Sequence, residues 1–175
     1  MSSHSQALIK LMTNNVLSAV QLLGFDLELA EKSSKLTLNG ATFSKPNPKA
    51  FEILVHFLLG QIDSERSQKA FSQCWPPILK EQQKEFRDTM FTWLTEITSP
   101  KQQKDNAAIA KFSSMLGHIK FPNITKSLLM TPGGLKICEL LFALAQYVML
   151  LRLLRLSKAY SSSITQQFRL LIVLN

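Results

Sequence analysis

The stretch Phe71-Ser72-Gln73-Cys74-Trp75-Pro76-Pro77 fixes a corner in the fold of this chain. A proline disfavours the helical region for the residue before it, so Pro77 restricts Pro76 and Pro76 restricts Trp75. A helix arriving along residues 64–74 must therefore end here, with an aromatic ring held at the break. A second landmark, Thr131-Pro132-Gly133-Gly134-Leu135-Lys136, opens the longest apolar segment. We expect structural roles for six residues of these landmarks: Trp75, Pro76, Pro77, Pro132, Gly133 and Gly134.

Apolar residues recur at helical spacing through most of the chain, and no segment shows the alternation of a strand. The stretch 24–46 contains turn chemistry and is expected to be a long connection with one helical turn. Helices are predicted over residues 5–23, 47–59, 64–74 (with Ser64 as N-cap), 78–98, 107–116, 124–130 and 131–157. The fold class is therefore all-α, a compact bundle of about six to eight helices.

Length and composition indicate one folded domain with a tail. The chain has 175 residues, of which 46% are hydrophobic and 18% charged, so it is long and apolar enough to bury a core. We place a head domain at residues 1–157. Residues 158–175 form a tail for which the sequence predicts no structure.

Positive charge is concentrated in the second half of the chain. Residues 1–99 hold ten Lys or Arg and ten Asp or Glu, whereas residues 100–175 hold ten and two, which accounts for the net charge of +8. Such an excess attracts nucleic acid, anionic lipid or an acidic protein surface. An ordinary solvated face is the competing interpretation. The candidate contacts for an acidic partner are Lys126, Lys136, Arg152, Arg155 and Lys158.

No residue pattern indicates catalysis, a metal or a cofactor. Cys74 and Cys138 lie among apolar neighbours, which favours buried thiols in a reducing compartment. The pair Glu52 and His56, four apart on a core helix, suggests a local hydrogen bond rather than a metal site. Gly133-Gly134 lacks the lysine and serine of a phosphate-binding loop, so capping or close packing is expected.

The twelve uncharged residues 140–151 are the one membrane-like feature of the sequence. A span needs about 20 residues, and charged residues flank this run closely, so we interpret it as a buried core helix. A further hypothesis is membrane association through this run and the apolar tail, which dependence of solubility on detergent would reveal. The N-terminus does not resemble a signal peptide, which favours a cytosolic or nuclear location.

Several motifs together resemble the N-terminal domain of augmin-like complex subunit six. They are Gly24-Phe25, the helix 50–59, the corner 71–77, Glu85-Phe86-Arg87 with Trp93, and Pro132-Gly133-Gly134 with Lys136. The resemblance covers roughly residues 10–157. The chain departs from the family pattern at a polar insert near residues 99–110 and at Asn175, where the family continues into coiled coils. We therefore expect the chain to be a fragment or a truncated product.

The resemblance implies a calponin-homology-like head that pairs with a similar domain of augmin subunit seven. It further implies a complex that binds microtubules and recruits the γ-tubulin ring complex, so that microtubules branch in the mitotic spindle. The implied location is the cytoplasm, with the cytoskeleton, spindle and centrosome. No enzyme activity, cofactor, nucleic acid or membrane partner is expected. The alternative is a basic helical nucleic-acid-binding domain, which needs a recognition helix less apolar than residues 131–157.

Overall fold

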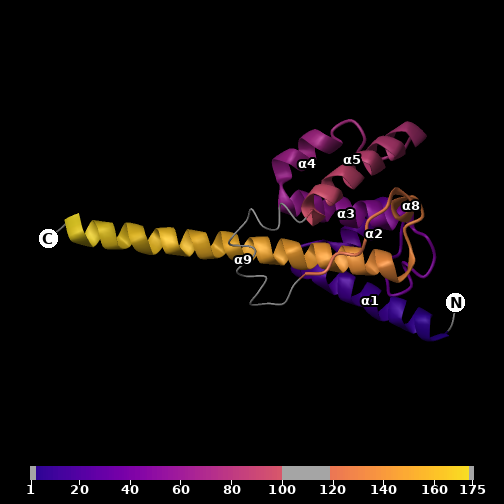
Figure 1. The fold of residues 1–175 in the computed structure, drawn as a ribbon, viewed down its shortest axis with the longest axis horizontal. Coiled ribbons are helices and arrows are strands. Elements are labelled where there is room, and N and C mark those ends of the chain that lie inside the picture. The colour runs from indigo at the N-terminus through magenta and orange to yellow at the C-terminus, as the bar shows by residue number, and fades with distance from the viewer. Residues whose placement is uncertain (1–2, 100–118, 174–175) are drawn as a thin grey trace.

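The computed structural model describes residues 3–99 and 119–173, with only the backbone for residue 158 and residues 161–173. This part of the chain folds into helices without any strand (Figure 1). The helices are α1 (Ser3–Leu22), α2 (Leu27–Ser34), α3 (Pro48–Ile62), α4 (Ser64–Phe71), α5 (Lys80–Thr98), α8 (Lys126–Met130) and α9 (Gly134–Val173). The prediction of an all-α bundle is confirmed. The predicted helix 107–116 and the polar insert near residues 99–110 fall outside the described residues, except for Ser99.

Helix α9 is the central element of the core, because its first half packs along α1 and against α3. Figure 1 shows α1 and α9 side by side within the head, while the second half of α9 projects away from it. Side chains of all three helices are completely buried at this contact, among them Val16, Val20, Leu54, Leu58, Leu140, Leu141, Leu144 and Val148. The apolar run 140–151 is therefore part of the core, as the sequence predicted.

Among the described residues, one helical segment, Gly134–Ser157, is long and apolar enough to cross a membrane, and 56% of its apolar window is buried within the fold. By the same test, α1 and α2 pass only as a pair bent by 108°. The core helix of a globular domain has these same properties. Burial against α1 and α3 accounts for the apolar character of α9.

Polar caps and turn residues set the helix boundaries. Asn47 accepts a hydrogen bond from the Ala50 amide at the start of α3, where Pro48 occupies the first turn. Gly24, at a φ of +92°, follows the end of α1, a backbone conformation for which glycine is suited.

Several boundaries differ from the sequence predictions; α4, for example, ends at Phe71 rather than at residue 74. Asp63, not Ser64, caps α4, because its carboxylate accepts from the Arg66 amide and a charged acceptor at that position suits the helix dipole. The stretch 24–46 contains the eight-residue helix α2, capped by Asp26, rather than a single turn. Helix α9 begins at Gly134 and passes residue 157 without a break, so most of the predicted tail is helical. The division of the domain at residue 157 stays a prediction.

The corner at 71–77 closes the side of the core formed by α3 and α5. Phe71 and Cys74 are buried, and Trp75 is half-buried, with its ring stacked on His56 at 3.8 Å and 6° between planes. Phe71 and Phe86 complete this aromatic cluster, with centroids 4.8 Å apart. Helix α4 thus ends with its last turn anchored to α3, and the chain can turn into α5.

Candidate functional site

The Pro132-Gly133-Gly134 landmark lies directly against the loop that precedes α3. The Asn47 amide donates to the Pro132 carbonyl at 2.8 Å, and the Gly134 amide donates to the Phe43 carbonyl at 2.8 Å. A Cβ on Gly133 would lie 2.9 Å from backbone atoms of Pro46, so the two backbones meet too closely for any side chain. Gly134 has a φ of +73°, a backbone conformation that suits glycine, and its amide is already bonded to Phe43.

Arg152, which is half-buried, and Arg155, which is exposed, both bond to the ends of other helices. One Arg152 Nη donates to the Leu23 carbonyl at 2.7 Å and to Gln61 Oε1 at 2.6 Å. Arg155 donates to the carbonyls of Gln61 at 3.2 Å and Ile62 at 2.6 Å. The last carbonyls of a helix lack intrahelical partners and carry partial negative charge. These two guanidinium groups therefore attach α9 to the C-terminal ends of α1 and α3.

The helix predicted over residues 131–157 would place both arginines at its own C-terminal end, and the structure corrects this. Helix α9 continues to Val173, so Arg152 and Arg155 lie mid-helix. The negative helix ends that they meet belong to α1 and α3. Sequence spacing could not show this because both partners are more than 90 residues away along the chain.

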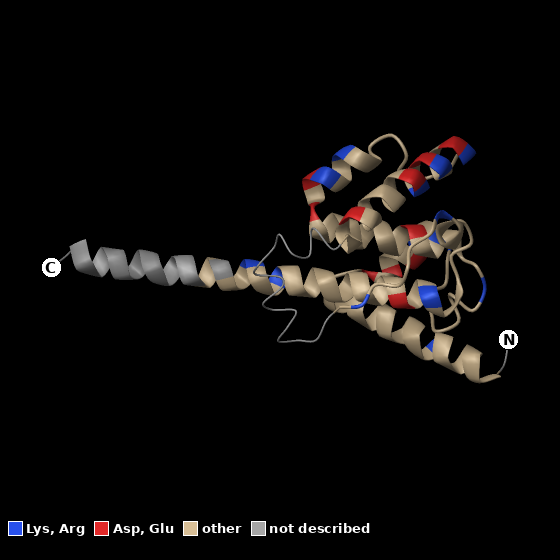
Figure 2. Ribbon diagram, in the orientation of Figure 1, with Lys and Arg blue, Asp and Glu red and all other residues tan. Residues whose placement is uncertain are grey.

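The four candidate cations whose side chains the structure describes do not lie on one surface. Lys126 is exposed at the start of α8, and Lys136 is exposed in the first turn of α9. At about 1.5 Å per residue, Lys136 and Arg152 are separated by roughly 24 Å along α9. The Lys158 side chain lies outside the described residues. Figure 2 shows blue segments at well-separated places on the ribbon rather than in one patch.

A groove of about 420 Å³ lies between α5 and α8, and the sequence interpretation assigned it no role. Its cations are Lys80, Lys84, Arg87 and Lys126, and its apolar lining consists of Phe91, Leu129 and Met130. Three of the four cations come from the half of the chain that has no net charge. The signal was present in the sequence as the spacing of Lys80, Lys84 and Arg87, which places them on one face of a helix.

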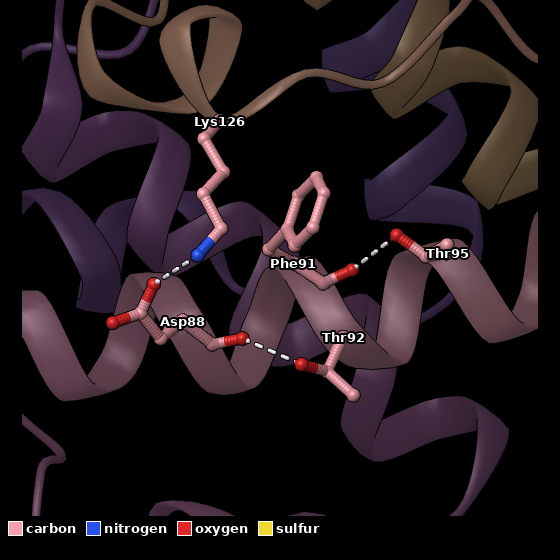
Figure 3. A network of polar contacts seen from close by, with 5 residues as sticks. All are labelled: Asp88, Phe91, Thr92, Thr95 and Lys126. Carbon is pink, nitrogen blue, oxygen red and sulfur yellow. Dashed lines mark hydrogen bonds and ion pairs between the residues drawn. The ribbon is translucent and has the colours of Figure 1, made fainter.

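Figure 3 shows the contacts at this groove. Lys126 reaches from α8 to Asp88 on α5, with Nζ 3.2 Å from Oδ1. The same ammonium lies 5.5 Å from the centroid of the Phe91 ring, within the range of a cation–π contact. The lysine thus joins the short helix α8 to α5.

Buried titratable groups surround the aromatic cluster. Burial raises the pKa of Glu52 to about 7, an effect that the nearby Arg87 charge opposes. Burial lowers the pKa of His56 to about 4, so this ring is neutral at physiological pH. Within the described part of the chain no hydrogen bond joins Glu52 to His56, and the ring instead stacks on Trp75. The prediction of a local hydrogen bond between Glu52 and His56 is therefore wrong, because stacking on Trp75 holds the imidazole instead.

Both cysteines are buried thiols of low reactivity. Burial raises the pKa of Cys74, with a further contribution from Glu85, and burial also raises the pKa of Cys138. Cys138 Sγ lies 3.4 Å from Thr13 Oγ1, a hydrogen bond in which either atom can donate. A raised pKa disfavours the thiolate that nucleophilic chemistry requires. Among the described residues, no group of three or more His, Cys, Asp or Glu side chains could hold a metal ion.

These features define an all-α head domain. Its distinctive features are close contacts between helices and a basic groove between α5 and α8. Residues 16–174 match the model of the family described as HAUS augmin-like complex subunit 6 N-terminus, and the chain belongs to this family. This is a family of complex subunits and not a known enzyme family. The resemblance noted from the sequence is thereby confirmed, while the calponin-homology type of the fold stays a prediction.

Two curated relatives carry the same family name. The chain is 30% identical to HAUS augmin-like complex subunit 6 of Danio rerio over 71% of this chain and 14% of the relative. It is 26% identical to the protein of that name from Homo sapiens over 86% of this chain and 15% of the relative. The chain thus spans about one seventh of the length of these relatives.

Proposed function

We propose that this chain is the head of an augmin complex subunit and acts by binding other proteins rather than by catalysis. The observation that carries the proposal is the family match over residues 16–174. The names of the two relatives describe a complex subunit, which supports other augmin subunits as partners and a cytoplasmic, spindle-associated location.

In this proposal the head has a calponin-homology-like fold and pairs with the similar head of augmin subunit seven. The pair contributes to microtubule binding and to γ-tubulin-dependent branching in the spindle, with the centrosome as a further location. The net charge of +8 supports a contact with an acidic lattice. Arg152 and Arg155 are bonded to helix ends of this chain, and Lys126 is paired with Asp88. Lys136 is exposed and forms no ion pair with any described residue, so it is the best placed of the described candidate contacts.

Co-sedimentation of the purified chain with microtubules, alone and with the subunit-seven head, tests this proposal. A lattice contact made by exposed cations weakens as salt rises, since screening shortens the range of the interaction. Salt-sensitive pelleting that requires the partner would support the paired head as the binding unit. If the pair forms but never pellets, the head is an assembly module only. Release by equimolar duplex DNA would instead favour the nucleic-acid alternative.

A further inference from the structure

The groove between α5 and α8 combines positive charge with an apolar wall. Lys80, Lys84 and Arg87 form one face of α5, and Lys126 approaches from α8. The lining holds a single carboxylate, that of Asp88, which is already paired with Lys126. Within the described part of the chain, the other three cations form no ion pair at 4 Å or closer. The groove therefore presents positive charge that its own residues leave largely uncompensated.

Two of the three acidic residues in the first half of α5, Glu81 and Glu85, lie mainly away from this face. At 100° per residue, Glu81 and Glu85 are rotated by roughly 80–120° from the centre of the face that holds Lys84 and Phe91. Glu85 acts instead on Cys74, whose pKa it helps to raise. Figure 2 shows acidic and basic segments interleaved along this part of α5, as expected for a helix with one basic and one acidic side.

The apolar wall is accessible from solvent. Met130 is 64% exposed at the end of α8, whereas Leu129 beside it is buried in the core. Phe91 is partly buried and lies under the Lys126 ammonium. A bulky apolar side chain placed between Met130 and Phe91 would be covered on two sides, and it would exclude water from the cations around it.

We propose that the α5–α8 groove binds an acidic peptide segment of a partner protein, one that carries a bulky apolar residue among its carboxylates. Lys80 and Arg87 are separated by about 10 Å along the helix, the length of roughly three residues of extended chain. Carboxylates on both sides of the apolar residue can therefore reach the cations together. This site goes beyond the assembly role proposed above, and it can be measured on this chain alone.

Other occupants suit the groove less well. A second copy of this chain carries a net charge of +8 and would be repelled. A membrane surface presents anionic headgroups to convex or flat faces, whereas these cations line a hollow. A nucleic acid backbone would leave the exposed Met130 side chain without an apolar partner. Charge complementarity and the apolar wall together favour the acidic peptide.

Fluorescence anisotropy on the full 175-residue chain tests the site. The probe is a fluorescein-labelled peptide, Glu-Asp-Glu-Leu-Phe-Glu-Asp-Glu, and its control carries two alanines in place of Leu-Phe. The variant Lys80→Glu with Lys84→Glu should lose about ten- to thirtyfold in affinity, since two attractions become repulsions at exposed sites. The matched variant Lys10→Glu with Lys32→Glu changes the net charge equally at exposed residues that do not line the groove, and it should lose less than about twofold.

The apolar half of the proposal has its own test. The change Met130→Ser removes an exposed side chain without opening the core, and it should reduce the preference for the Leu-Phe peptide over the alanine control by about threefold or more. Circular dichroism confirms that each variant is folded. Equal losses in the two charge-reversal variants, or equal affinity of the wild-type chain for both peptides, would overturn the proposal. So would absence of peptide binding, or binding only to phosphatidylserine vesicles.

Discussion

The substitution Gly133→Ala tests the contact between the start of α9 and the loop before α3. A Cβ at this position would lie 2.9 Å from Pro46 Cα and N and 3.0 Å from Lys45 C. All three are backbone atoms, so no side chain can rotate away, and the loop itself must shift. Overpacking of this kind costs about 1–3 kcal/mol.

A displaced loop also strains the two backbone hydrogen bonds that flank the contact, from Asn47 to Pro132 and from Gly134 to Phe43. A hydrogen bond contributes about 1 kcal/mol net. We therefore expect Gly133→Ala to lower the free energy of unfolding by about 2–4 kcal/mol. Urea denaturation followed by circular dichroism measures this quantity directly.

Gly60→Ala is the matched control, because it makes the same chemical change within helix α3. The nearest atom to a Cβ there is Ser67 Oγ at 3.8 Å, an ordinary contact. Alanine in a helix interior is favoured over glycine, so this variant should gain about 0.5–1 kcal/mol. If Gly133→Ala were within about 0.5 kcal/mol of the wild type, the close approach would not constrain the fold and the reasoning would be refuted.

Four further substitutions test other parts of the structure by the same measurement. Trp75→Ala should cost about 2 kcal/mol, below the 3–5 kcal/mol of a fully buried ring, because the ring is half exposed but loses its stacking on His56; an unchanged stability would reject the stacking. Glu52→Gln should be more stable relative to the wild type at high pH than at low pH. The pKa of Glu52 in the folded protein is about 7, above its ordinary value of 4.5. The buried carboxyl therefore contributes to the free energy of unfolding at low pH, and this contribution is lost as the pH rises through 7. The free energy of unfolding of Glu52→Gln minus that of the wild type should rise by about 2–3 kcal/mol from pH 4.5 to 8. A difference that stays constant would contradict the burial of the Glu52 carboxyl. Arg152→Ala should cost about 1–3 kcal/mol by leaving helix-end acceptors unpaired, whereas Lys126→Ala at an exposed ion pair should cost less than about 1 kcal/mol; equal costs would argue against the internal role of the arginine.

The sequence predicted the elements of this fold well where apolar periodicity and turn residues agree. Helix α3 begins where Asn47-Pro48 indicated, α1 ends near Gly24, and α5 begins just after the Trp-Pro-Pro corner. The family was also recognisable from these landmarks, and the match over residues 16–174 confirms it. Local patterns carry this information because helix starts, stops and buried faces depend on neighbours a few residues away.

The site was less predictable because it depends on which helices come together. The charge count separated a neutral half from a basic half, yet the groove draws Lys80, Lys84 and Arg87 from the neutral half and Lys126 from the basic one. Arg152 and Arg155 were expected to contact an acidic partner, but both side chains bond to helix ends of this chain that are distant in sequence. Net charge along a sequence does not report how charges are grouped in space.

The sequence by itself determined the helical class, the corner at 71–77 and the apolar helix that became the core, since these follow from backbone restriction and from the burial of periodic apolar faces. Tertiary structure alone decided that Gly133 must lack a side chain, that two arginines attach α9 to the ends of α1 and α3, and that four cations line a hollow beside Met130. The physical reason is that these properties depend on distances between segments far apart in the chain, and only the packing of the helices sets those distances.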